Sequence, residues 1–401
     1  MTLFRLVAKS LRQHALSTSI TALSIALATG LWLSVWVVKT QAQATFTSVS
    51  AGFDAVLGAR GSGLQLVLNA VFHLESSPGN LPYSDFEEIQ RDGRVALAVP
   101  LAVGDNFQGY RLVGTTPELF EKAEYAPARR FRASPGGRLF DPARREAVVG
   151  SFAARRLGLK VGDSFHPFHG LLYDERSQHS ETYVVVGILE PSNTPADRVI
   201  WIPLAGLQQM SGHDPKAAAD ISAVLVKLRS PIAGRQMETL YNKQGTRLTF
   251  AWPIGTLIAQ LFDKIGWFEK VLALVSYLVA LVAAGSVLAS IYNSMNERRR
   301  EIAILRALGA RRRTLFSCVV LEAVAISALG VLAGGVVYAG LMTGVARIIQ
   351  AQTGVVLNPF APAPVMLWAP LGMLALGALA GVIPAIKAYR TDVASNLVPS
   401  S

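Results

Sequence analysis

Four long apolar stretches constrain the fold of this chain more than any other feature of its sequence. Residues 15–38, 271–296 and 365–386 contain no charged side chain, and 314–346 contains only Glu322. Each stretch is long enough to cross a hydrocarbon core of about 30 Å at about 1.5 Å per residue. The sequence therefore predicts a membrane protein whose four transmembrane α-helices span 17–39, 265–295, 314–347 and 365–386.

The distribution of basic residues predicts the orientation of these spans. The chain has a net charge of +11, but residues 40–264 hold 23 Lys or Arg against 22 Asp or Glu. The positive excess lies beside the apolar stretches, at 1–16, 296–313 and 387–401. Because short loops rich in Lys and Arg stay in the cytoplasm, we expect these three segments inside and residues 40–264 outside. A nucleic-acid partner is not expected, since that needs a basic surface on a soluble domain.

Tryptophan positions agree with this topology. The span ends predicted to lie outside carry Trp32, Trp36, Trp267 and Trp368. Aromatic belts of this kind form at membrane interfaces. An alternative interpretation is that the first stretch is a cleaved signal peptide, with Ala42-Gln43-Ala44 as the cleavage site. Its apolar run of 24 residues is longer than the signal core of about 7–15 residues, so we expect it to be retained.

The external region, 40–264, is predicted to form a large α+β domain. Strand patterns occur at 94–103, 110–114, 182–189, 198–203, 222–228 and 247–252, and helix patterns at 84–91, 151–157 and 231–243. The ends, 40–56 and 253–268, are expected to extend spans one and two as a helical stalk. Residues 348–364 form a second, short external loop. The only cysteine, Cys318, falls in the third span, so the external domain has no disulfide.

The loop 296–313 combines an amphipathic helix pattern with a run of arginines. Asn296 suits the N-cap, Glu297 and Glu301 suit the positive end of the helix dipole, and Gly309 suits the C-terminal stop. An apolar stripe consists of Ile302, Leu305 and Leu308. Such a stripe fits either the membrane interface or a groove on a partner. A simpler alternative is a basic loop that only fixes orientation.

This loop closely resembles the signature of the MacB/FtsX/Lol family of ABC transporter permeases. In both, a glutamate and an arginine run precede a short Ile-Leu-Arg-Ala-Leu-Gly-Ala helix between spans two and three. The resemblance extends to residues 4–31, 148–163, 185–189 and 383–390. It implies that the loop couples the permease to an ATPase through Glu297, Arg298, Arg299, Arg300, Glu301, Ile302, Leu305, Arg306, Leu308 and Gly309.

The resemblance also implies a set of partners. The sequence has no Gly-x-x-x-x-Gly-Lys-Ser/Thr phosphate loop, unlike fused members such as the macrolide exporter. It is similar instead to split members, which implies a separate cytoplasmic ATPase that holds ATP and Mg²⁺, with no cofactor bound by this chain. A second permease copy, identical or different, is also implied. No Gly-x-Ser-x-Gly or His-Glu-x-x-His motif is present, so we expect a non-catalytic subunit.

The expected function follows from the same resemblance. It implies a subunit of the bacterial inner membrane that exports or extracts a periplasmic or membrane client, such as a lipoprotein, peptide or drug. A periplasmic client or adaptor protein and membrane lipid would then be its partners. An alternative is an FtsX-like signalling or scaffold subunit that regulates an envelope protein.

Glu322 is the one acidic residue within the four apolar stretches, and charges at such depth are functional suspects. It lies nine residues past Arg313, and thus within about 14 Å of the cytoplasmic side by helix rise. We favour a structural pairing with Arg311 to Arg313, or with the coupling helix, over ion conduction.

Three of the six histidines cluster in the external region, at His166, His169 and His179, near Asp174, Glu175 and Glu181. Imidazoles and carboxylates together can hold zinc or another transition metal. The spacing matches no strict zinc motif, and Pro167 prevents a regular helix from aligning the first pair. Both a solvated polar loop and a metal-responsive site, with a role in zinc homeostasis, remain open.

Overall fold

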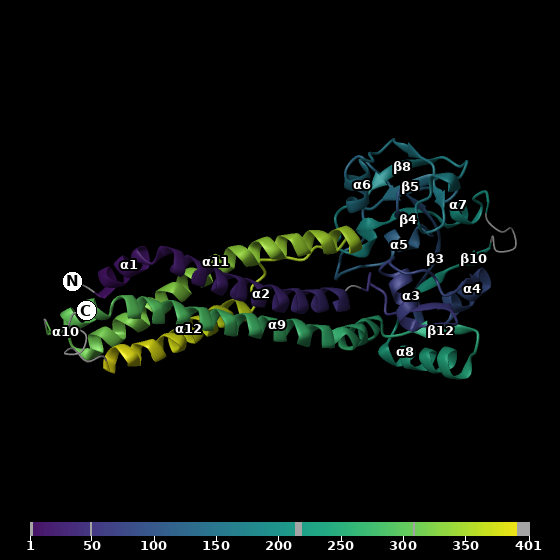
Figure 1. Cartoon of the computed structure of the whole chain (residues 1–401). Helices are drawn as coiled ribbons and strands as arrows, with labels where there is room; N and C mark the ends of the chain where they lie inside the picture. The colour runs from purple at the N-terminus through teal and green to yellow at the C-terminus, as the bar shows by residue number, and fades with distance from the viewer. Residues whose placement is uncertain (1–2, 49, 213–218, 308, 391–401) are drawn as a thin grey trace. The chain divides into compact units, whose positions relative to one another are not determined.

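The chain separates into two compact units. The computed structural model describes residues 3–48, 50–212, 219–307 and 309–390. Unit 1 falls within Met1–Gln41, Ile265–Ala346 and Asn358–Ser401, and unit 2 within Ala42–Lys264 and Arg347–Leu357. Long helices make up unit 1, and unit 2 is built on a β-sheet (Figure 1).

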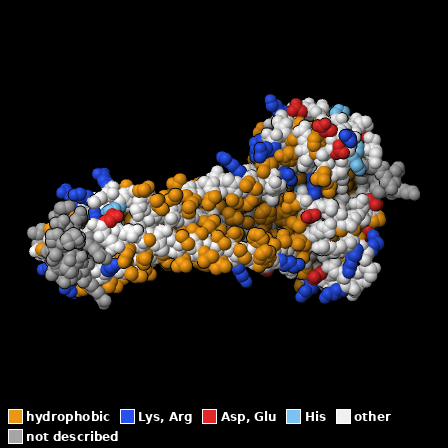
Figure 2. Space-filling model, in the orientation of Figure 1, with side chains coloured by type: hydrophobic (Ala, Val, Ile, Leu, Met, Phe, Trp, Pro, Cys, Tyr) orange, Lys and Arg blue, Asp and Glu red, His pale blue; other side chains and the backbone are white. Residues whose placement is uncertain are grey.

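Unit 1 is a bundle of long apolar helices. Its elements are α1 (Leu3–Gln13), α2 (Ala15–Ser48), α9 (Ile254–Glu297), α10 (Arg299–Ala307), α11 (Arg312–Thr353) and α12 (Val365–Arg390). Among the described residues, α2, α9, α11 and α12 are long and apolar enough to cross a membrane. Hydrophobic side chains cover most of the visible face of these helices (Figure 2). Leu332 and Val336 of α11, for example, are 72% and 74% exposed, as expected of side chains that face lipid.

Glycines allow these helices to approach closely. A Cβ placed on Gly330 of α11 would lie 2.5 Å from the Cβ of Ile25 on α2. One placed on Gly377 of α12 would lie 1.8 Å from the Oγ of Ser327 on α11. Since no side chain fits at either position, the glycines set the spacing of the bundle, as small residues do in membrane helix pairs.

Unit 2 is built on one mixed sheet. The strands are β1 (Ala55–Ala59), β2 (Leu81–Pro82), β3 (Val95–Phe107), β4 (Tyr110–Thr115), β5 (Glu146–Val149), β6 (Ser164–Phe165), β7 (Phe168–His169), β8 (Tyr183–Ile188), β9 (Ile200–Pro203), β10 (Asp220–Ile221), β11 (Ala223–Leu228) and β12 (Leu248–Ala251). In the described part of the chain, the main sheet runs β12-β1-β11-β3-β4-β9-β5-β8-β6, and β7 also pairs with β3. The β4–β9 and β5–β8 pairs are parallel, and the other neighbours are antiparallel. β2 and β10 pair separately.

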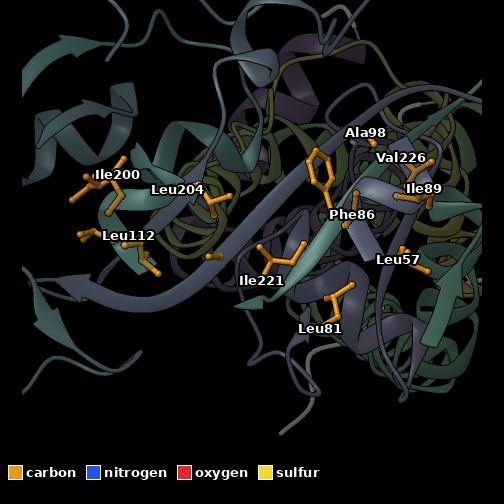
Figure 3. Packing of buried hydrophobic residues seen from close by; sticks show 14 of the residues in the cluster. Leu57, Leu81, Phe86, Ile89, Ala98, Leu112, Ile200, Leu204, Ile221 and Val226 are labelled. Carbon is orange, nitrogen blue, oxygen red and sulfur yellow. The ribbon is translucent and has the colours of Figure 1, made fainter. Parts of the chain in front are cut away.

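Both faces of the sheet are buried, which explains why its strands are apolar runs rather than alternating patterns. Successive residues of β11 point to opposite faces, so Val224 and Val226 enter one core cluster and Leu225 enters the other. In Figure 3, Val226 lies near Ala98 and Ile89 in the first of these clusters. The second cluster includes Ile254, from the start of α9.

Short helices cover the two faces. They are α3 (Gly63–Ala70), α4 (Tyr83–Arg91), α5 (Glu118–Glu121), α6 (Ser151–Leu157), α7 (Leu204–Gln208) and α8 (Pro231–Glu238), with 3-10 turns at Glu175–Ser177 and Pro195–Arg198 and a π-helical turn at Thr239–Gln244. Helices α4, α6, α7 and α8 contribute to the first core cluster, and α3 and α5 to the second. Unit 2 is thus an α+β domain with helices on both sides of a sheet.

One predicted boundary is wrong. The first part of the stalk predicted at 40–56 is helical as far as Ser48, but residues from Ala55 form strand β1. Ala51 and Gly52 both have positive φ angles and turn the chain between the two elements. The apolar side chain of Val56 then enters the core of unit 2 and is fully buried.

The end of α11 belongs to unit 2. The side-chain amide of Asn193 forms two hydrogen bonds with the backbone of Val356. Its Oδ1 accepts from Val356 N at 2.5 Å, and its Nδ2 donates to Val356 O at 3.3 Å. The Nε of Arg198 donates to Ala351 O at 3.1 Å. Gly354, at φ +76°, ends the helix. The segment predicted as a simple external loop therefore begins with residues that are built into the sheet domain.

Candidate functional site

The helix α10 lies between two long apolar helices, as the sequence predicted, but it begins later than expected. Asn296 was expected to cap it and instead lies inside α9, which continues to Glu297. The amide of Arg298 still bonds to Ser294 O at 3.2 Å, so the break falls at Arg298 itself. The expected stop is present: α10 ends at Ala307, and Gly309 has a φ of +95°.

Arg298, at the break before α10, is tied to two other helices of unit 1. Its Nη1 donates to Ser10 Oγ at 2.7 Å and its Nη2 to Gln13 Oε1 at 3.2 Å, both on α1. Ser10 Oγ in turn donates to Glu322 Oε1 on α11. We call Arg298, Ser10 and Glu322 the three-helix link.

The three-helix link revises the expected partner of Glu322. Glu322 and Ser10 are 8% and 1% exposed, so both polar groups require bonding partners. Of the two partners predicted for Glu322, Arg311 to Arg313 do not pair with it among the described side chains, whereas the start of the coupling-helix segment reaches it through Ser10. Arg312 instead places its guanidinium 5.6 Å from the ring centre of Tyr389. The basic group that supports Glu322 comes from the start of the α10 segment and acts through a serine.

A cavity of about 430 Å³ adjoins the link. It is lined by Leu3 and Leu6 of α1, Ile302 and Ile304 of α10, and Leu315 of α11, with Glu322 also in its wall. A largely apolar cavity leaves room for α10 to shift against α1 and α11. The three-helix link supplies directional hydrogen bonds at this place.

The other predicted coupling residues fall into three groups. Ile302 is buried at 8% exposure and faces the chain itself, whereas Ile304, which was not singled out, is 44% exposed. Glu297 is exposed and lies 3.3 Å from His14 Nδ1, and Arg306 is half-buried. Leu308 and the side chains of Arg299, Arg300, Glu301 and Leu305 lie outside the described part of the structure.

The predicted histidine cluster is revised in unit 2. His169 and His179 come together, but the third group is the buried Asp105 of β3 rather than His166. His166 Nδ1 instead lies 3.1 Å from the carbonyl of Glu181. The nearby acids are used elsewhere: Asp174 accepts from Arg176 N, and Glu181 accepts from Ser211. Asp105 is 64 residues from His169 in the sequence, so no local spacing could have indicated it.

Burial, neighbouring charges and hydrogen bonds shift the pKa values of several ionisable groups in unit 2. Burial, and then the positive charges of Arg111 and Arg198, lower the pKa of His73 to about 3. The pKa of Arg111 is lowered to about 10, first by burial and then by Arg198. Hydrogen bonding to Arg138 lowers the pKa of Glu146, which is 8% exposed. These groups belong to neither candidate site.

Two family models match the chain. The model described as "MacB-like periplasmic core domain" matches residues 18–239, from α2 to the end of the helix α8 segment. The model described as "FtsX-like permease C-terminal" matches residues 273–393, which cover most of α9 and all of α10, α11 and α12.

Solved structures resemble unit 2 in part. The periplasmic region of MacB from Actinobacillus actinomycetemcomitans matches at 12% identity and a TM-score of 0.36, covering 54% of this chain and 94% of that one. The extracellular domain of the noncanonic ABC-type transporter YknZ from Gram-positive bacteria matches at 15% identity and a TM-score of 0.31, covering 49% of this chain and 98% of that one.

Proposed function

The chain belongs to the MacB/FtsX-type family of ABC transporter permeases, and from this premise we propose that a separate cytoplasmic ATPase drives it by gripping α10. With four apolar helices of spanning length, the chain is a multi-pass membrane protein. In this proposal α10 lies at the cytoplasmic end of the bundle and unit 2 lies outside. ATP and Mg²⁺ are held by the ATPase, and this chain converts the movement of that partner into movement of its own helices.

The three-helix link is the observation that carries this proposal. A helix that only fixed membrane orientation would need positive charge but no specific internal bonds. Arg298 instead bonds to α1, and through Ser10 it reaches a buried carboxylate on α11. Charge-assisted hydrogen bonds of this kind are short and directional. A displacement of α10 would therefore be transmitted to α1 and α11 together.

Helix α11 is suited to carry that displacement onward. It is continuous from Arg312 to Thr353, which is 42 residues, or about 63 Å at the usual helix rise. Glu322 lies in its third turn, and the residues that follow its C-terminal end are clasped by Asn193. The helix is thus a continuous connection between Glu322 and the segment that Asn193 holds, which supports a mechanical role for α11.

The client is expected to be handled by unit 2 or within the bilayer rather than in a hydrophilic channel. The four apolar stretches expose mainly hydrophobic side chains, and Glu322, the one acid within those stretches, is bonded within the bundle. We propose export or extraction of a lipoprotein, peptide or drug at a bacterial inner membrane. A second permease copy and a periplasmic client or adaptor would complete the assembly.

Site-specific crosslinking tests the position of the ATPase. In the full chain expressed in native membranes, Ile304→p-benzoylphenylalanine places a photoreactive group on α10 at a side chain that is 44% exposed. We expect irradiation to yield an adduct with a protein that contains a Gly-x-x-x-x-Gly-Lys-Ser/Thr loop, identified by mass spectrometry. Ile232, 71% exposed on α8 of unit 2, is the matched control position and should yield no such adduct. Adducts of Ile304 without any nucleotide-binding protein would contradict the proposal.

The three-helix link is tested in the purified complex by Ser10→Ala. This change removes the hydroxyl that joins Arg298 to Glu322, so we expect ATP hydrolysis to fall several-fold while the complex still forms. The control is Ser17→Ala, which loses only the exposed 2.8 Å contact with Ser290. An unchanged ATPase rate in Ser10→Ala would remove the link from the mechanism. Stimulation of the rate by an added lipoprotein favours transport, and no stimulation favours the signalling alternative.

A further inference from the structure

Strand pairing gathers three potential metal ligands on one patch of unit 2. Asp105 on β3 and His169 on β7 are direct partners in the antiparallel ladder. Phe168 also forms a β-bridge with Gln178, and the residue that follows Gln178 is His179. Asp105 Oδ1 lies 3.4 Å from His169 Nδ1 and 3.2 Å from His179 Nε2.

The local backbone explains why Asp105 points toward these histidines. The β3–β4 register shifts between Val103 and Asp105, and such bulges redirect the side chain that follows them. Asn106 then anchors the opposing segment, because its Nδ2 donates to Gly170 O at 2.9 Å and to Leu172 O at 3.1 Å. The carboxylate of Asp105 is fully buried, and His179 is 4% exposed at its side chain.

Hydrogen bonding fixes the tautomer of His179. Its Nδ1 lies 2.7 Å from the carbonyl oxygen of Ser211, and a carbonyl only accepts, so Nδ1 carries a proton. In a neutral imidazole Nε2 then has a lone pair, and this lone pair faces a carboxylate oxygen. Two acceptors at this distance require either a shared proton, on Nε2 or on the carboxyl group, or a metal ion between them. A backbone carbonyl behind the ring is also the usual support of a metal-binding histidine.

The two distances from Asp105 fit a metal ion. Zinc binds nitrogen and carboxylate oxygen at about 2.0–2.1 Å, so two ligands of a tetrahedral ion lie about 3.4 Å apart. The two distances from Asp105 Oδ1, 3.2 and 3.4 Å, agree with this separation. The three ligand atoms all lie within 4.8 Å of one another. His169 is 54% exposed at its side chain, which gives an ion access from solvent and leaves room for water as a fourth ligand.

We propose that Asp105, His169 and His179 bind one zinc-type divalent transition-metal ion and that the ion fastens the segment of residues 168–179 to the sheet. Two imidazoles and one carboxylate form a donor set that suits zinc, and also nickel or copper. This proposal is independent of the ATPase, since it concerns unit 2 alone. It replaces the histidine trio predicted from the sequence by one with a buried acid at its centre.

Zinc titration of the full chain tests the site. The protein is purified in detergent without a polyhistidine tag, stripped with a chelator, and titrated with Zn²⁺ against a chromophoric competitor. We expect one ion per chain and a raised melting temperature. His169→Ala and His179→Ala should each weaken binding on the order of 100-fold, since loss of a ligand exceeds the 10–100-fold cost of losing a supporting group.

His166→Ala is the matched control, because His166 lies in the same segment but bonds to Glu181 O. It should bind zinc as the unsubstituted chain does. His169 is exposed, so His169→Ala keeps the fold and remains informative if His179→Ala unfolds. Cobalt substitution adds a visible absorption spectrum that reports tetrahedral ligands. Wild-type affinity in His169→Ala would overturn the proposal, and so would an unsubstituted chain that binds no Zn²⁺, which would assign the cluster as an aspartate–imidazolium ion pair.

Discussion

His73 shows how one buried side chain makes the stability of unit 2 depend on pH. Its ring is 6% exposed and packs edge-on against Trp201. Nδ1 has no hydrogen-bond partner among the described residues. Because the pKa is lowered to about 3, the folded protein keeps this ring neutral at pH values where an unfolded chain protonates it.

The first prediction follows from this difference. Between the ordinary value of 6.5 and about 3, the unfolded state binds one more proton than the folded state, so stability falls as the pH falls. Each pH unit in this range lowers the free energy of unfolding by at most about 1.4 kcal/mol. His73→Asn removes the titration, and Asn tolerates the φ of 55° at this position. We expect melting temperatures measured from about pH 6.5 to about pH 4.5 to fall less in the variant, by about 4–8 °C. Equal falls in both proteins would contradict it.

The sequence indicated some residues of the candidate sites and gave no signal for others, for a clear physical reason. Glu322 stood out because an acid in an apolar span is costly, and Arg298 because it belongs to the basic run. Ser10 and Asp105 carried no such signal. A serine near the N-terminus and an aspartate in a strand are ordinary residues until the fold brings them beside a partner that is distant in sequence. The pattern did not single out Ile304, because which face of a short helix is buried depends on the neighbours that the fold places against it.

At the scale of elements, long or strongly apolar segments were predicted well. The spans and the strands β3, β4, β8, β9, β11 and β12 all occur near their expected positions. The strand β1 and the helix α3 were not predicted as such. β1 follows α2 after only a short turn, and α3 has eight residues, too few for periodicity to be distinctive. The N-cap of α3, Ser62, accepts from Gln65 N. A serine at this position was the sequence signal available for the start of α3.

Two adjacent glycines of α11 supply a prediction for helix packing. A Cβ on Gly334 would lie 2.7 Å from the Cβ of Thr29 on α2, whereas one on Gly335 meets nothing within 4 Å. Gly334→Ala should therefore destabilise the bundle by about 1–3 kcal/mol through overpacking. Gly335→Ala should stabilise it slightly, by about 0.5–1 kcal/mol, because alanine is the better helix former. Thermal unfolding of both proteins in detergent measures the difference, and changes of the same sign would show that Gly334 does not set the contact.

At the scale of the whole molecule, the sequence predicted a helical part and an external α+β part, and the chain does divide into a helical unit and a sheet unit. Hydropathy and charge act locally along the chain, so they indicate spans and orientation. They carry no information on residues 347–357, whose place in unit 2 depends on Asn193 and Arg198.

Cysteine labelling tests the proposed orientation of the entire chain. Cys318 is the only cysteine, so Cys318→Ala gives a background without thiols. Leu172→Cys, 85% exposed in unit 2, should react with a membrane-impermeant maleimide in intact spheroplasts. Ala307→Cys, exposed at the end of α10, should react only after the membrane is opened. Reaction of Ala307→Cys in intact spheroplasts would place α10 outside and end the proposed role of the ATPase.

The length of α11 has a consequence for how this chain tolerates insertions. A helix turns by about 100° with each added residue. Glu322 must meet Ser10 of α1, and Gly334 must face Thr29 of α2, and one continuous helix carries both residues. A single codon inserted between them would bring one of the two contacts out of phase, whereas three or four added residues would nearly restore the angle. The loop around Leu172 has no such phase to keep, so natural length variation should be concentrated there and absent from α11.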